Sequence, residues 1–137
     1  MARVHSDRVD NSPLSASQVL DLHESFAWAV IMSNGLAGAW ALAANWVEPL
    51  RTKALWWFTA VAEVTIFIQV ALGVYLQAGE NIEPPKFHMF YGFVAIIAVG
   101  LIYSYRAQMK PYRYLLYGFG GLFLMGLGIR AMLVGAR

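Results

Sequence analysis

The stretch HESFAWAVIMSNGLA, His23–Ala37, has a second copy in HMFYGFVAIIAVGLI, His88–Ile102, and the two align without gaps. The matched positions are His23 with His88, Phe26 with Tyr91, Ala27 with Gly92, Trp28 with Phe93, Ile31 with Ile96, and Gly35-Leu36 with Gly100-Leu101. A further match lies downstream of each copy, ALGV at Ala71–Val74 and GLGI at Gly126–Ile129. Repeats of this kind are typical of duplicated helical hairpins. The sequence therefore predicts two parallel hairpins, each opening with a histidine.

Both copies belong to apolar segments that are long enough to cross a membrane. The chain of 137 residues is 59% hydrophobic and only 13% charged, which is far from the composition of a soluble domain. About 20 apolar residues in a helix span the hydrocarbon layer of a bilayer. Four such segments are present, at Ser25–Trp46, Ala54–Leu76, Phe87–Tyr105 and Tyr114–Gly135. We predict an all-α, polytopic membrane protein, an up-down bundle of four transmembrane helices over residues 23–137 after a polar tail over residues 1–22.

The loops between the segments differ in charge, and this difference predicts the orientation. Loops 47–53 and 106–113 hold the basic residues Arg51, Lys53, Arg106, Lys110 and Arg113, with Glu48 as their only acid. Loop 77–86 holds Lys86 beside Glu80 and Glu83. Because cytoplasmic loops carry an excess of Lys and Arg, we expect loops 47–53 and 106–113 inside and both termini outside. The expected location is a prokaryotic plasma membrane.

The polar tail ends in a pattern that starts helices. Ser15 is followed three residues later by Gln18, the spacing of a capping box, in which the two side chains bond each other's backbone N–H groups. The first helix is therefore expected to begin near Ser15 and to carry His23 into the membrane interface. The alternative is a frayed tail that ends at the first apolar segment.

Composition also limits the chemistry. The chain has no cysteine, so disulfides, thiolate metal sites and cysteine nucleophiles are excluded, and a metal has only His5, His23, His88 and carboxylates to bind. A net charge of +2 is too small to indicate a nucleic-acid partner. No catalytic Ser/His/Asp pattern, phosphate-binding glycine loop or HExxH zinc motif occurs. An electron-transfer or non-catalytic role is favoured over a stand-alone enzyme.

The two repeated histidines are the candidate metal site. The first and third helices run in the same direction, so both imidazoles have one depth, and in an up-down bundle these helices face each other diagonally across the core. Two opposed imidazoles are the axial ligands of a six-coordinate b-type heme. One turn after His23 and His88, the small residues Ala27 and Gly92 are expected to make room for the heme ring. The propionates of the heme are expected to pair with Arg130 and Lys86. The residues expected to pack on the macrocycle are Phe26, Tyr91, Phe87 and Phe90. The alternative is a pair of interfacial histidines that hydrogen-bond water or lipid headgroups.

These segments resemble a known group of membrane proteins. HESFA opens the first helix, FIQVALGV ends the second, a proline-containing loop follows, and FHMFYG opens the third. This order, over residues 21–135, is similar to one half of heme A synthase and to a broader set of membrane cytochrome b modules. The resemblance implies a four-helix bundle in which His23 and His88 hold heme b near the outer face. Heme A synthase has two such bundles, whereas this chain has one, and here Glu24 follows the histidine instead of preceding it by a turn.

Polar residues inside the apolar segments are the second candidate site. Glu63 lies near the middle of the second segment, where a charge is costly, and Asn34 reaches a similar depth in the first. We expect Asn34 to hydrogen-bond Glu63 between the two helices. Gln69 lies about 120° around the helix from Glu63, so both cannot point at the bundle centre. Glu63 then serves either a proton path or quinone site, or it is a neutral carboxylic acid that fastens two helices.

Three functions stay open at this point. The first is a small b-type cytochrome or heme-bearing subunit of a respiratory or other electron-transfer complex. The second is a heme-free accessory or scaffold subunit, because the fourth segment carries glycines at positions 121, 128 and 135, seven residues apart, that form a seam for close helix packing inside the bundle or against another membrane subunit. The third is a quinone-interacting membrane anchor that uses Glu63.

Overall fold

The computed structural model describes residues 15–136 and confirms an all-α fold of four long helices. The helices are α1 (Ala16–Ala44), α2 (Lys53–Ala78), α3 (Lys86–Tyr105) and α4 (Arg113–Gly135), with short 3₁₀ turns η1 (Glu48–Leu50) and η2 (Lys110–Tyr112) before α2 and α4. Each helix is long and apolar enough to cross a membrane. The ends of α2, α3 and α4 agree with the predicted segments to within two residues.

The first helix begins earlier than the first apolar segment. Ser15 is its N-cap and forms the predicted capping box, in which the Ser15 hydroxyl accepts from the Gln18 backbone N–H and the Gln18 side chain accepts from the Ser15 N–H at 2.8 Å. Residues 16–22 are therefore part of α1 and not of the polar tail, whose residues 1–14 lie outside the described part of the chain. With 29 residues, α1 is about 44 Å long, so its first turns extend beyond a hydrocarbon layer about 30 Å thick.

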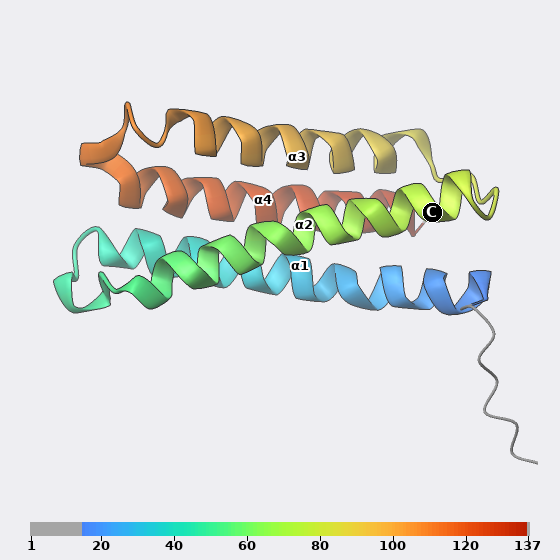
Figure 1. Ribbon diagram of the computed structural model, residues 1–137, viewed down its shortest axis with the longest axis horizontal. Coiled ribbons are helices and arrows are strands. Elements are labelled where there is room, and N and C mark those ends of the chain that lie inside the picture. Colours follow the sequence, from blue (N-terminus) through green and yellow to red (C-terminus); the bar gives the residue numbers. More distant parts are fainter. Residues whose placement is uncertain (1–14, 137) are drawn as a thin grey trace, which may run out of the picture.

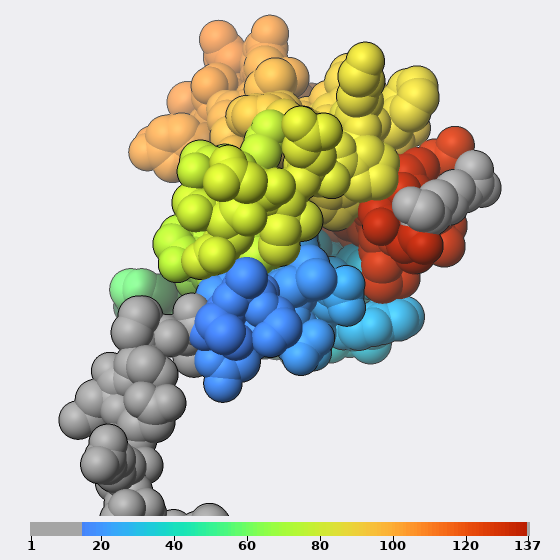
Figure 2. Space-filling model, turned by 90° about the vertical axis from the view of Figure 1, so that its right-hand side faces the viewer, coloured from blue at the N-terminus to red at the C-terminus, as the bar shows by residue number. Residues whose placement is uncertain are grey.

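The helices form an up-down bundle in which α1 and α3 occupy a diagonal (Figure 1). Helix α1 packs mainly against α4 and α2, and α3 packs mainly against α4. Helices α2 and α3 approach each other near their connecting loop and separate toward their other ends (Figure 1). We call the end with the start of α1, loop 79–85 and the end of α4 the histidine end, and the end with η1 and η2 the basic end. Figure 2 looks onto the histidine end, where the start of α1, the α2–α3 connection and the end of α4 gather.

Helices α1 and α4 are in backbone contact through glycines. A Cβ added at Gly121 would lie 2.6 Å from Cα of Gly38, and one added at Gly118 would lie 2.9 Å from Cα of Leu42. Further along α4, a Cβ at Gly128 would lie 3.0 Å from the Ile31 side chain. Since real Cβ atoms do not approach backbone this closely, α1 and α4 require glycine at their contact. The predicted glycine seam is thus used inside the bundle.

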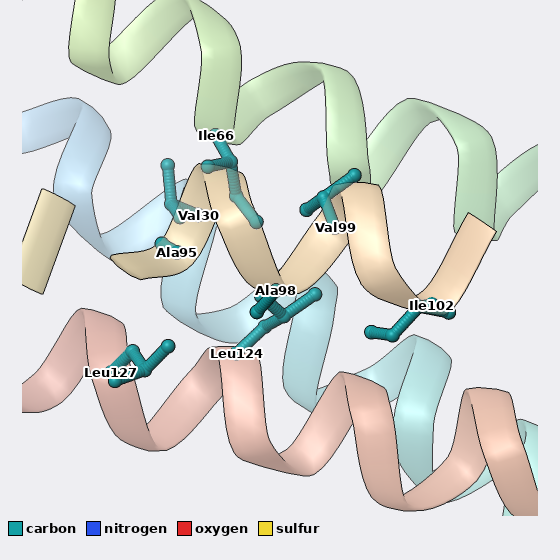
Figure 3. Close-up of a cluster of buried hydrophobic side chains, with 8 residues drawn as sticks. All are labelled: Val30, Ile66, Ala95, Ala98, Val99, Ile102, Leu124 and Leu127. Carbon is teal, nitrogen blue, oxygen red and sulfur yellow. The ribbon is translucent and has the colours of Figure 1, made fainter. Parts of the chain in front are cut away.

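The apolar core joins all four helices, and equally apolar side chains cover the outside. Figure 3 shows the central cluster, in which the buried side chains of Val30, Ile66, Ala95, Ala98, Val99, Ile102, Leu124 and Leu127 meet. The outer faces expose large apolar side chains such as Trp28, Met32, Leu36, Ile97, Leu101 and Phe123, each more than half exposed. A bundle that is apolar on both its inner and outer faces has lipid as its natural solvent.

Candidate functional site

The two repeated histidines meet inside the histidine end of the bundle. The imidazole rings of His23 on α1 and His88 on α3 have centroids 5.8 Å apart and an interplanar angle of 79°. Both residues are half-buried. Their juxtaposition across the α1–α3 diagonal was predicted from the aligned repeat and is confirmed. The ligand role of the two histidines stays a prediction.

His88 is held in a single orientation by α4. Its Nδ1 lies 2.8 Å from the backbone oxygen of Ala131, a distance at which Nδ1–H donates to the carbonyl. The tautomer with the proton on Nδ1 leaves the Nε2 lone pair free to bind a metal. Gly135, one turn further along α4, makes room for this ring, because a Cβ there would lie 2.7 Å from Nδ1 of His88.

His23 is held by α2. Gln69 donates from Nε2 to the backbone oxygen of His23 at 2.7 Å, and Gly73, one turn later on the same face, lies against the imidazole, since a Cβ there would be 3.3 Å from Cε1. Nδ1 of His23 and Oε1 of Gln69 are buried without a hydrogen-bond partner in the described residues. Buried polar atoms are normally paired, so these two atoms are exceptions within the described residues.

Gly73 and Gly135 were not predicted as parts of this site. The sequence did contain a signal for Gly73, since it stands in the repeated segment ALGV, but that segment gave no indication that its glycine faces an imidazole. Gly135 was predicted only as a member of the packing seam. Both glycines lie against histidine rings. Ala27 and Gly92 were predicted to make room for the heme ring, and this stays a prediction; a Cβ at Gly92 would meet Val70 at 3.9 Å, and Ala27 is half-buried.

The other residues predicted near the heme divide into two groups. Phe26 and Tyr91 pack against the central core cluster, and Arg130 lies at the surface, where its Nε is 3.4 Å from the hydroxyl of Tyr91. Phe87 and Phe90 are 68% and 57% exposed, and their packing on a heme ring stays a prediction. Both lie on the outer face of the first turns of α3. Lys86 is exposed as the first residue of α3.

The predicted hydrogen bond between Asn34 and Glu63 is wrong. The amide of Asn34, which is only 2% exposed, donates to the backbone oxygen of Ala62 at 3.1 Å and to that of Val30 at 2.9 Å. Ala62 is fully buried at the α1–α2 contact, and its small side chain leaves its carbonyl within reach. Glu63 directly follows Ala62 and lies about 100° further around α2, so its half-buried carboxyl group does not face the Asn34 amide. Asn34 still fastens α1 to α2, through the backbone.

The centroid separation of the two imidazoles is close to that of two imidazoles bound to one iron. A metal–nitrogen bond is about 2 Å long, and the centre of an imidazole ring lies about 1 Å beyond its bound nitrogen. The centres of two imidazoles on opposite sides of one metal ion are therefore about 6 Å apart. The observed separation is 5.8 Å. Within residues 15–136, no group of three or more His, Cys, Asp or Glu side chains lies close enough together to hold a metal ion. Within the described residues the candidate metal site therefore consists of the two imidazoles alone.

No protein-family model, curated protein or solved structure matches this sequence.

Proposed function

We propose that this protein is a small integral-membrane b-type cytochrome, or a heme-bearing subunit of an electron-transfer complex, with His23 and His88 as the axial ligands. The observation that supports this function best is the contact between the two imidazoles, 5.8 Å apart on diagonal helices of an apolar bundle. One-electron transfer is the chemistry that heme supplies when it is bound between two histidines.

The residues around the pair have defined tasks in this proposal. The Ala131 carbonyl holds the Nδ1 proton of His88, which leaves the Nε2 lone pair available and would make it a stronger donor to a bound iron. Gln69 fixes the backbone at His23, and Gly73 and Gly135 leave space for the rings. Arg130 and Lys86 stand at the same end of the bundle, where they offer positive charge to propionate groups.

The two other functions have less support. A scaffold subunit was suggested by the glycine seam, but Gly118 and Gly121 contact α1 of the same chain and do not need a partner subunit. A quinone-interacting anchor requires polar groups beside Glu63, and Asn34, the partner predicted for Glu63, bonds backbone oxygens instead. Other membrane-protein subunits remain the expected partners of a cytochrome, as donors or acceptors of its electron.

The visible absorption spectrum tests the heme proposal. The full chain, purified in detergent and supplied with hemin, should give a Soret band and, after reduction, an α-band near about 560 nm, the region of b-type hemes. His23→Ala and His88→Ala should each abolish this six-coordinate spectrum because one axial nitrogen is lost. His5→Ala changes the third histidine of the chain and should leave the spectrum intact. Far-ultraviolet circular dichroism checks that every variant keeps its helices.

Two results would overturn the proposal. One is the absence of any heme band after hemin is added to the folded wild-type protein. The other is an unchanged spectrum in His23→Ala or His88→Ala, which would mean that iron is held elsewhere.

A further inference from the structure

The basic end of the bundle contains a cavity that the proposed cytochrome does not use. Its volume is about 410 Å³, and it is lined by Trp56, Arg106, Ala107, Lys110, Arg113 and Tyr117. These residues come from the start of α2, the end of α3 with the following turn, and the start of α4, at the end of the bundle where α2 and α3 have separated (Figure 1). Three cationic side chains therefore border one opening.

The helices that supply these three cations carry no acid of their own, although Glu63 of α2 lies near Tyr117 in the lining. Residues 84–137 contain no Asp or Glu. Arg106 is held by Tyr103, whose hydroxyl accepts from its guanidinium at 3.1 Å and whose ring lies 3.9 Å below it. Arg113 lies over the rings of Trp56 and Tyr114, at 5.8 Å and 5.0 Å, and donates to the Tyr114 hydroxyl at 3.2 Å. Aromatic rings and hydroxyl groups fix both guanidinium groups but leave their charge available for an anion.

The surroundings of the cavity are those of a membrane interface. Trp57, Tyr103, Tyr105 and Tyr112 are all more than half exposed at this end of the bundle, as in the aromatic belts of membrane proteins. An apolar groove of about 640 Å³ lies between α3 and α4 and extends from Met109 and Tyr112 to Phe123. Its lining adjoins that of the basic cavity at Met109 and Lys110, which are neighbours in the sequence. The apolar groove thus begins beside the cationic groups and runs along α3 and α4 away from the basic end.

We propose that this cavity binds the phosphate headgroup of one anionic phospholipid, with Arg106, Lys110 and Arg113 as its ligands and the α3–α4 groove next to its acyl chains. Arginine pairs with phosphate through two parallel N–H···O bonds, and lysine adds a mobile charge. Basic pockets between transmembrane helices are suited to anionic headgroups. A zwitterionic lipid has a cationic group of its own, which three cations repel, so the site should select phosphatidylglycerol over phosphatidylcholine.

Native mass spectrometry tests the proposal on the full chain. The protein, purified in detergent, is mixed with equal amounts of phosphatidylglycerol and phosphatidylcholine, and the lipids that stay bound are identified. One phosphatidylglycerol should be retained in preference to phosphatidylcholine. Lys110→Gln and Arg113→Gln should each weaken this binding about five-fold, the loss expected for one cation near an anionic headgroup.

The matched control is Lys53→Gln, which removes a cation from the same end of the bundle but outside the cavity. It should change the binding less than about two-fold. Equal losses in Lys53→Gln and Lys110→Gln would mean general surface attraction and would overturn the proposal, as would equal retention of the two lipids by the wild-type protein. Lys110 is exposed in η2, so its replacement should leave the helices intact, which circular dichroism verifies.

Competition experiments identify the source of the phosphate. Glycerol phosphate and inorganic phosphate carry the same charged group without acyl chains. Neither should displace phosphatidylglycerol at millimolar concentration, because the apolar groove strengthens the binding of a lipid and not of a phosphate without acyl chains. Displacement by either one would show that the cavity takes a soluble phosphate, and the lipid assignment would be wrong.

Discussion

Asn34 forms a fully buried polar link between α1 and α2. Its amide donates to the Ala62 carbonyl at 3.1 Å from a position that is 2% exposed. We expect Asn34→Ala to lower the free energy of unfolding by about 1 kcal/mol, the typical contribution of one interhelical hydrogen bond in a membrane protein. The loss stays small because the hydroxyl of Thr65 also donates to the Ala62 carbonyl and leaves it paired. Unfolding in mixed micelles with increasing dodecyl sulfate measures this difference.

Ser33→Ala is the control for this prediction. Its hydroxyl bonds the Val30 carbonyl within α1 and makes no contact with α2 through that bond. It should change the unfolding free energy by less than about 0.5 kcal/mol. If Asn34→Ala has no larger effect than Ser33→Ala, the amide does not stabilise the α1–α2 contact.

The contacts of the histidine pair and of Asn34 differ in how far the sequence predicts them. The meeting of His23 and His88 follows from the repeat and from the up-down order of the helices, both of which are readable from the sequence. The partner of Asn34 depends on rotation of α2 about its own axis, which decides whether the Ala62 carbonyl or the Glu63 carboxyl faces α1. A rotation of about 100° separates the two outcomes, and the uniform hydrophobicity of α2 does not fix it.

At the scale of helices, the contact between α1 and α4 depends on glycine. We expect Gly121→Ala to destabilise the bundle by about 1–3 kcal/mol, since the new Cβ would lie 2.6 Å from Cα of Gly38 and the helices would have to move apart. Gly126→Ala, on the same helix, is the control because no atom lies within 4 Å of the added Cβ. It should be neutral or slightly stabilising, as alanine favours a helix more than glycine does. The two variants are compared by the same unfolding measurement, and equal stabilities would contradict a close α1–α4 contact.

The helices themselves were predictable, while their contacts were predictable only in part. Lengths and limits of α2, α3 and α4 follow from apolar runs that end in prolines and charges. The start of α1 required the Ser15–Gln18 capping box, because hydrophobicity alone places the start at Ser25. The glycines of α4 predicted a seam but not its partner. Only the structure identifies Gly35 and Gly38 on α1 as the facing residues, because glycines in one helix do not show which other helix packs against them.

At the scale of the whole molecule, four helices in an up-down order place both described ends of the chain at the histidine end (Figure 1). This topology was predicted from the apolar segments and loops and agrees with the fold. Which end faces the cytoplasm depends on an interaction outside the molecule, between the loops, the insertion machinery and the membrane potential. The lysine and arginine count of the loops is therefore the information that predicts it.

The orientation can be measured directly, because the chain has no cysteine of its own. We expect a membrane-impermeant maleimide to label Glu83→Cys, in the loop at the histidine end, in intact cells, and to label Gln108→Cys, at the basic end, only after the membrane is opened. Both positions are exposed, so access to the reagent depends on the side of the membrane alone. The expected result follows from Arg51, Lys53, Arg106, Lys110 and Arg113 at the basic end, since an excess of basic residues keeps a loop in the cytoplasm. The opposite labelling would place the histidine pair near the cytoplasmic face, and the orientation predicted from the loop charges would be wrong.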